Sequence, residues 1–193
     1  MTKVLLTGFE PFGTATSNPS GEIVKQISGD NIVTAVLPVA YTQSAERLLA
    51  LIAEHNPDVV ICLGQAEGRT QISPEKVAIN LDDARLADNE GVLRNDVKIL
   101  EGGPDAYFST LPVKEIVDAI KTAGVPAAIS LSAGAFLCNH VFYVAQNKFA
   151  GTNVRSGFVH VPLMDSQAPE FPGLPTMPLD QMVIAVRAML EVL

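Results

Sequence analysis

The chain has 193 residues, of which 48% are hydrophobic and 18% charged, a composition that favours one well-filled globular domain over two domains or a disordered chain. Its formal net charge is −8 and Lys and Arg form no cluster, which argues against a nucleic-acid partner because phosphate binding needs concentrated positive charge. No apolar run reaches membrane-spanning length and the first residues lead directly into a strand, so we expect no membrane partner and no signal peptide. We therefore expect a cytoplasmic location with reduced cysteines.

The first part of the chain alternates strands and helices. Short apolar runs predict strands over residues 3–7, 31–37 and 58–63. A helix should begin at Pro19, with Asn18 as its N-cap. A second helix follows the second strand, and its apolar stripe consists of Ala45, Leu48, Leu49 and Ile52.

The rest of the chain has one extended middle excursion before the alternation returns. A half-exposed strand is expected over 75–81, with Val77, Ile79 and Leu81 on one face, whereas 105–109 should be irregular. The remaining expected elements are a helix over 112–123 (Val113, Ile116, Val117 and Ile120 inward), a buried strand over 126–132, a helix over 136–146, a strand over 157–161, a loop over 167–178 and a helix over 179–192 (Met182, Val183, Val186 and Leu190 inward).

Strands that alternate with helices predict an α/β fold, with a mainly parallel, twisted sheet covered by helices on both faces. No internal repeat or linker is evident, so residues 1–193 should form a single domain.

Cys138 lies just after the small-residue turn 133–135, in the first turn of a predicted helix. Free N–H groups and the positive end of the helix dipole favour a thiolate there, which would make Cys138 an activated nucleophile. The alternative is a buried structural cysteine, because cysteine is among the most buried residue types. Cys62, inside an apolar strand, is predicted to belong to the core.

A thiol nucleophile needs an imidazole base, and the chain has three histidines. His55 ends a surface helix, and His140 lies about 200° around the helix from Cys138. His160, near the end of a strand, is the best candidate, although a histidine between valines can also be a core residue bonded to backbone. Among the many acids, Glu75 stands out only weakly as the group that orients the imidazole, and spacing leaves that choice open.

Phe9 and Phe12 lie in a loop directly after the first strand. Such aromatic residues either pack onto the core or line a pocket at the carboxyl end of the sheet, where open α/β sheets bind their ligands.

Six motifs follow one another between the first strand and Pro162, and together they resemble the pyroglutamyl peptidase I family, the pyrrolidone-carboxylate peptidases among the cysteine exopeptidases. The motifs are Thr7–Gly13, Gly64–Arg69, Ile72–Asn80, Asp83–Gly91, Ser132–Asn139 and Gly157–Pro162.

The resemblance implies Cys138 as the nucleophile, His160 as general base and acid, and Glu75 as the acid that orients the imidazole. It also implies a single-domain α/β/α sandwich, a homotetramer, and neither cofactor nor metal. The expected reaction hydrolyses the amide bond after an N-terminal 5-oxoproline of a blocked peptide, through a thioacyl-enzyme.

The expected pocket must accept a small, flat and neutral lactam ring. Its apolar walls would come from Phe9, Phe12, Phe136 and Leu137. Gln65 is a candidate for polar contacts, Asn18 either binds substrate or caps the helix, and Arg85 is either an oxyanion donor or a partner of a nearby aspartate. Two other functions stay open at this point, which are a different thiol amidohydrolase or acyltransferase, and a noncatalytic small-molecule binder.

Overall fold

The computed structural model describes residues 2–193 and contains a five-stranded central sheet of order β2-β1-β3-β7-β4. Strands β2, β1, β3 and β7 are parallel to one another, and only the two-residue β4 runs antiparallel, against β7. Their bounds are β1 Val4–Phe9, β2 Ile32–Leu37, β3 Val59–Gln65, β4 Ser73–Pro74 and β7 Arg155–Val161.

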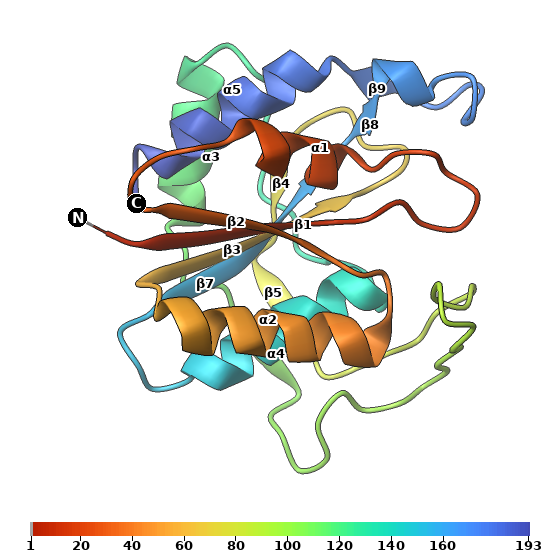
Figure 1. Cartoon of the computed structure of the whole chain (residues 1–193), viewed down its shortest axis with the longest axis vertical. Coiled ribbons are helices and arrows are strands. Elements are labelled where there is room, and N and C mark those ends of the chain that lie inside the picture. Colours follow the sequence, from red (N-terminus) through yellow and green to blue (C-terminus); the bar gives the residue numbers. More distant parts are fainter. Residues whose placement is uncertain (1) are drawn as a thin grey trace.

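Helices cover both faces of this sheet (Figure 1). One face carries α1 (Pro19–Gln26), α3 (Val113–Thr122) and α5 (Leu179–Leu190). The other carries α2 (Tyr41–His55) and α4 (Leu137–Phe149). The predicted α/β/α arrangement with a mainly parallel sheet is therefore confirmed. None of the helices described within residues 2–193 is both long and apolar enough to cross a membrane.

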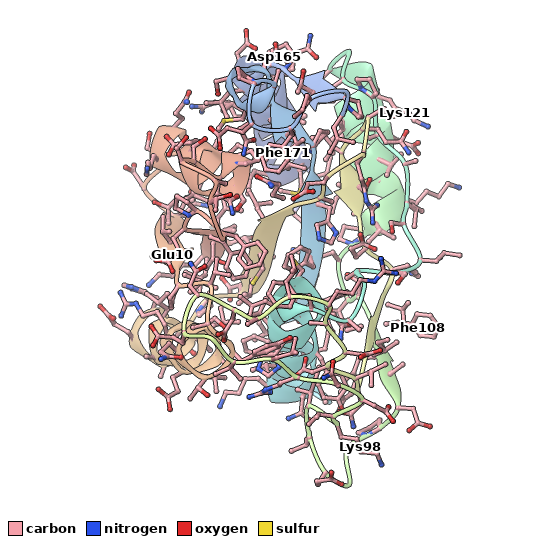
Figure 2. The ribbon with its side chains drawn as sticks, turned by 90° about the vertical axis from the view of Figure 1, so that its right-hand side faces the viewer. Glu10, Lys98, Phe108, Lys121, Asp165 and Phe171 are labelled. Atoms are coloured by element: carbon pink, nitrogen blue, oxygen red, sulfur yellow. The ribbon has the colours of Figure 1, made fainter. Side chains whose placement is uncertain are left out.

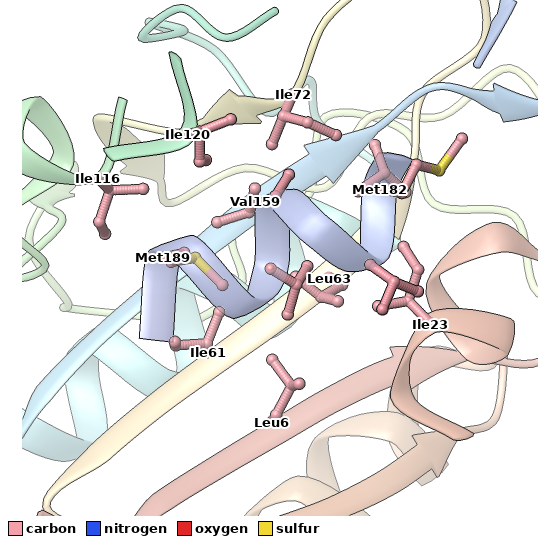
Figure 3. Close-up of a cluster of buried hydrophobic side chains, with 14 of the residues drawn as sticks. Leu6, Ile23, Ile61, Leu63, Ile72, Ile116, Ile120, Val159, Met182 and Met189 are labelled. Carbon is pink, nitrogen blue, oxygen red and sulfur yellow. The ribbon is translucent and has the colours of Figure 1, made fainter. Parts of the chain in front are cut away.

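Alternation along the strands separates two cores. On β3, Ile61 and Leu63 point toward α1, α3 and α5, where they meet Met182 and Met189 (Figure 3), whereas Cys62 points toward α2 and α4. Cys62 is completely buried, as predicted. Each fully buried aliphatic side chain contributes about 1.5–3 kcal/mol to stability, so these two layers fix the strand register.

The helix boundaries follow local chemistry. Asn18 Oδ1 accepts a hydrogen bond from the Ser20 N–H at 3.0 Å, and Pro19 occupies the first position of α1, as predicted. Helix α2 ends at His55, and the capping residue that follows it, Asn56, has a left-handed φ of 43°. Its buried stripe was predicted incorrectly at Leu49, which is exposed, because Leu51 and Tyr41 occupy the inner face.

The buried strand predicted over 126–132 is wrong. This segment makes only isolated bridges, Ile72 with Ala127 and Glu75 with Ser130, and Leu131 is 73% exposed. It lies beside β4, where Pro74 has no N–H to donate, so a continuous ladder cannot form.

The middle excursion is more regular than predicted. The strand expected over 75–81 is present only as the half-buried β5 (Val77–Ile79). It pairs antiparallel with β6 (Ala106–Phe108), which lies in the segment 105–109 that was expected to be irregular. Between them, residues 80–105 extend away from the sheet, and Figure 2 shows Lys98 at the opposite end of the molecule from Asp165. The Asn80 side chain holds this excursion, because it accepts from the Leu100 N–H and donates to the Leu100 carbonyl.

The C-terminal part also contains short elements within a segment expected to be a loop. Strand β9 (Thr176–Met177) pairs parallel with β8 (Leu163–Met164). A 3-10 turn, η1 (Asp165–Gln167), follows β8. The predicted final helix is confirmed as α5, although Leu190 is only partly buried.

Candidate active site

The site is built on a glycine and a histidine that face each other across two parallel strands. Gly64 on β3 is in register with His160 on β7. Residues in register on neighbouring parallel strands direct their side chains to the same face of the sheet. The His160 imidazole therefore lies on the face that a Gly64 side chain would occupy, which is the face covered by α2 and α4.

Phe158 and Cys138 together fill the space that Gly64 leaves free. A Cβ atom added to Gly64 would lie 3.0 Å from Cys138 Sγ and 2.6 Å from Phe158 Cζ. Cys138 is the second residue of α4, so the prediction that it lies in the first helical turn is confirmed. The absence of a side chain at residue 64 thus lets the sulfur lie against β3 at the position that is in register with His160.

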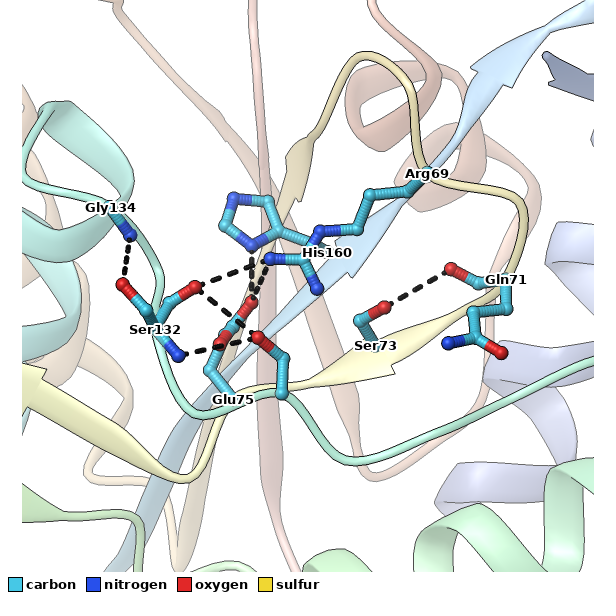
Figure 4. A network of polar contacts seen from close by, with 8 residues as sticks. Arg69, Gln71, Ser73, Glu75, Ser132, Gly134 and His160 are labelled. Atoms are coloured by element: carbon cyan, nitrogen blue, oxygen red, sulfur yellow. Dashed lines mark hydrogen bonds and ion pairs between the residues drawn. The ribbon is translucent and has the colours of Figure 1, made fainter.

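A buried carboxylate holds the imidazole (Figure 4). Glu75 Oε1 lies 2.7 Å from His160 Nδ1 and accepts a hydrogen bond from Arg69 at 2.9 Å. Arg69 also donates to the Ser132 carbonyl, which ties the network to the segment before α4. Because an ionised carboxylate can only accept, it favours the tautomer with a proton on Nδ1, and the Nε2 lone pair stays free to take a proton.

Burial shifts the pKa values of both Cys138 and His160. It raises the pKa of the Cys138 thiol to about 12, and the nearby Glu75 carboxylate adds to the rise. Burial also lowers the pKa of His160, although the hydrogen bond and charge of Glu75 act in the opposite direction. The rise in the Cys138 pKa opposes the thiolate expected from the helix start. The backbone N–H does lower the pKa, but desolvation outweighs it.

Cys138 opens onto a cavity of about 180 Å³ at the carboxyl end of β1 and β3. The walls are mostly apolar, with a few polar groups, as in many small-molecule sites. The lining residues are Phe9, Phe12, Asn18, Val39, Gln65, Glu67, Phe136, Leu137 and Cys138.

The structure brings nearly all the predicted pocket residues to this cavity. Phe9 does both things considered for it, since it is buried in the core and also lines the cavity. Asn18 caps α1 and donates to the Glu10 carbonyl, so both of its amide groups are used within the protein. Arg85 is the exception, because it lines an adjacent cavity of about 260 Å³ that shares Phe12 and Phe136.

Three residues of the site were missed. Val39 and Glu67 lie in loops after strands, and the family motif that contains Arg69 gives no sign that this arginine bonds Glu75. The general rule that ligands bind at the carboxyl ends of parallel strands points to Val39 and Glu67, which follow β2 and β3.

A second network of the same composition lies nearby. His140 Nδ1 is 2.9 Å from Asp82 Oδ2, which also accepts from Arg94 at 2.7 Å. The Tyr41 ring packs edge-on against His140, and the Arg94 guanidinium lies over that ring. Within residues 2–193, no group of three or more His, Cys, Asp or Glu side chains could hold a metal ion.

Comparison with known proteins gives consistent matches over the whole chain. A family model described as pyroglutamyl peptidase matches residues 2–193. The pyrrolidone-carboxylate peptidase of Aliivibrio fischeri (strain MJ11) is 46% identical, over 99% of this chain and 94% of that protein. Pyrrolidone-carboxylate peptidase 1 of Ralstonia nicotianae is 47% identical, over 99% of this chain and 92% of that protein.

Solved structures agree with these sequence matches. Pyroglutamyl peptidase I of Bacillus amyloliquefaciens superposes with a TM-score of 0.94 at 43% identity, covering 98% of this chain and 95% of the other. A mutant pyrrolidone carboxyl peptidase of the hyperthermophile Pyrococcus furiosus gives a TM-score of 0.92 at 40% identity, covering 98% and 97%.

Proposed function

Because the chain belongs to the pyroglutamyl peptidase family, and is thus a cysteine exopeptidase that removes N-terminal pyroglutamate, we propose that Cys138 is its nucleophile, with His160 as general base and acid and Glu75 as the carboxylate that orients the imidazole. One observation carries this assignment. The Cys138 sulfur lies beside the side-chain position that Gly64 leaves empty, and His160 is in register with that glycine on the neighbouring strand. The proposal includes the whole chain, 1–193, as one catalytic domain.

The first half-reaction forms the acyl-enzyme. His160 Nε2 takes the proton from Cys138 as the sulfur attacks the carbonyl carbon that joins the lactam ring to the next residue. The imidazolium formed in this step is stabilised by the Glu75 carboxylate, 2.7 Å from Nδ1. The imidazolium then gives its proton to the leaving amine as the C–N bond breaks, which leaves a thioester on Cys138.

The second half-reaction releases pyroglutamate. His160 takes a proton from water as the water oxygen attacks the thioester carbon, and the proton returns to the sulfur when the C–S bond breaks. In both half-reactions, negative charge develops on the carbonyl oxygen. The Cys138 N–H, at the start of α4, is the donor we assign to that oxygen.

The cavity explains why the substrate must be blocked. Phe9, Phe12, Phe136 and Leu137 offer apolar walls to a neutral ring, and Gln65 and Asn18 complete the proposed substrate-binding set. A free N-terminus carries an ammonium group, whose burial without a partner costs several kcal/mol. The single carboxylate of this described lining, Glu67, is exposed and compensates little of that cost.

Arg85 belongs to the proposal in a different place from the one expected. It is absent from the described lining of the Cys138 cavity, so we assign it to the adjacent cavity, where it would meet the peptide beyond the lactam. The wall shared by the two cavities, Phe12 and Phe136, would then separate the ring from the leaving chain.

A fluorogenic pyroglutamyl amide tests the assignment of the nucleophile. Cys138→Ser should lower kcat/KM by about 10³-fold or more while the melting temperature stays nearly unchanged, because the substitution is almost isosteric. Cleavage that survives in this variant would refute the assignment. A noncatalytic binder is tested by iodoacetamide, which should inactivate the wild type unless 2-pyrrolidone protects the cavity, since Cys62 is fully buried.

We also propose that the chain forms a homo-oligomer, a tetramer. An exposed apolar patch of Phe108, Ile129 and Leu131 supports this. Backbone hydrogen bonds that join Lys76 to Ser109 and Ser130 bring the two segments of the patch side by side. In light scattering, Leu131→Asp should lower the particle mass if the patch is an interface, and an unchanged tetramer would exclude the patch.

The proposed location is the cytoplasm. The mechanism requires a reduced thiol at Cys138, and both cysteines are free in the structure, which suits a reducing compartment. Cell fractionation checks this, and activity recovered mainly outside the cytoplasmic fraction would contradict it.

A further inference from the structure

Gln167 is fully buried at the end of η1, yet all of its amide groups have partners. Its Oε1 accepts from the Met164 N–H at 2.9 Å, and its Nε2 donates to the Ser17 carbonyl at 3.2 Å. A backbone N–H can only donate and a backbone carbonyl can only accept, so these two contacts fix which end of the Gln167 amide is nitrogen.

The orientation of Gln167 determines the orientation of Gln65. Gln167 Nε2 makes its second hydrogen bond to Gln65 Oε1, at 2.9 Å. A rotated Gln65 amide would place two N–H groups against each other, so Gln65 must present its oxygen to Gln167. Its own Nε2 has no hydrogen-bond partner in the described chain, while Gln65 lines the cavity beside Cys138.

We propose that Gln167 is a positioning residue that locks the Gln65 amide with its N–H₂ group toward the cavity, where that group donates a hydrogen bond to the ring carbonyl of the lactam. This rests on the proposed function, since it assigns the contact that recognises the 5-oxo group. The backbone of Gln65 adjoins Gly64, against which the Cys138 sulfur lies, whereas its side chain leaves β3 on the face of Leu63, where it meets Gln167.

The lock gives the enzyme a way to reject N-terminal proline. Proline has a five-membered ring of similar size but no ring carbonyl, so its binding would leave the Gln65 N–H₂ group without a partner. A site built to hydrogen-bond one group of its substrate discriminates strongly against an analogue that lacks it. With Gln65 free to rotate, the amide would present either its donor or its acceptor, and this discrimination would weaken.

Gln167→Glu tests the lock. An ionised carboxylate at this position still accepts from the Met164 N–H but attracts Gln65 Nε2, which rotates the Gln65 oxygen into the cavity against the lactam carbonyl. The Kd of 2-pyrrolidone, measured by calorimetry, and kcat/KM for the fluorogenic amide should both worsen by about tenfold. The matched control is Gln181→Glu on the exposed start of α5, which should change neither.

A double-mutant cycle with Gln65→Ala separates positioning from a structural role. Gln65→Ala alone should weaken 2-pyrrolidone binding about tenfold. In that background, Gln167→Glu should weaken binding by less than about a further twofold. An equal tenfold loss with and without Gln65, or unchanged 2-pyrrolidone binding in folded Gln167→Glu, would overturn the proposal.

Gln167→Met covers the case in which Gln167→Glu does not fold, because it removes the amide without adding a charge. Because the Gln65 amide can then rotate, this variant should bind 2-pyrrolidone about threefold more weakly. Unchanged binding in the folded variant would overturn the proposal. Iodoacetamide inactivation without ligand should keep its wild-type rate in all these variants. Failure of Cys138→Ser to abolish turnover would instead count against the proposed function.

Discussion

Two networks of the same chemical composition lie on or beside α4, and only one of them has its imidazole in register with Gly64, against which the Cys138 sulfur lies. Arg69–Glu75–His160 and Arg94–Asp82–His140 each join a guanidinium, a fully buried carboxylate and an imidazole. The imidazole–carboxylate distances are 2.7 and 2.9 Å. In each, one carboxylate oxygen has no hydrogen-bond partner in the described chain. Their local geometry therefore does not distinguish them.

The difference lies in what each imidazole faces. His160 stands opposite Gly64, whose missing side chain leaves room for the Cys138 sulfur. His140 is only two residues from Cys138 in sequence, but it points to the other side of α4, where it packs against Tyr41. A carboxylate–histidine pair thus indicates a base only when the fold gives it a proton to move. The His140 network instead fixes residues 80–105 to α4.

The largest expected difference between the networks concerns their carboxylates. Glu75→Gln should lower kcat by about 10²–10⁴-fold, because the imidazolium loses the charge that stabilises it and the tautomer is no longer specified. Asp82→Asn should keep kcat within about threefold but destabilise the protein by about 1–3 kcal/mol. Turnover and thermal unfolding of both variants check this, and a larger loss of kcat in Asp82→Asn would remove the distinction.

A smaller effect is expected from adding a methyl group at Gly64. Gly64→Ala would place a methyl group 3.0 Å from Cys138 Sγ and closer still to Phe158, so we expect kcat to fall about 10–100-fold through displacement of the sulfur. Gly157→Ala, on the same sheet, would clash with Leu111 and Ser109 instead. That control should cost about 1–3 kcal/mol of stability and leave kcat of the folded protein unchanged. Equal losses of kcat in Gly64→Ala and Gly157→Ala would show that the space at Gly64 has no special role in placing the sulfur.

The smallest expected effect is a shift of the pH profile. The wild-type acid limb of kcat/KM should lie below pH 6.5, the ordinary His value, because burial lowers the pKa of His160. Arg69 adds to this lowering, so Arg69→Met should raise that pKa and keep His160 protonated to higher pH. The acid limb then moves to higher pH, and Arg94→Met should leave it in place. A shift in the opposite direction would show that the charge of Arg69 does not act on His160.

Hydrophobic periodicity was enough to predict most of the fold. The apolar runs of β1, β3 and β7 and the stripe of α3 are local patterns, and the structure confirms each of them. The failures at 105–109 and 126–132 have a different origin. Those segments pair with β5 and with the strand edge at Pro74, and such distant partners leave no periodic signal in the segments themselves.

The site was predictable in its components but not in its electrostatics. A cysteine at a helix start and a histidine on a strand are visible in the sequence, whereas the choice of Glu75 came from the family motifs. Desolvation of Cys138 depends on Phe158 and Gly64 behind it, so the rise of the thiol pKa could not be inferred from helix position. Arg69, in a loop, and Gln167, in η1, reach the site through side-chain contacts, which spacing does not encode.

The most direct test of the account compares kcat/KM for the pyroglutamyl amide in His160→Ala and His140→Ala, with folding verified for both. If Gly64 and His160 define the reactive face, His160→Ala loses about 10³-fold and His140→Ala stays within about threefold of wild type. Substantial turnover in folded His160→Ala, or a comparable loss in His140→Ala, would contradict the assignment of the base.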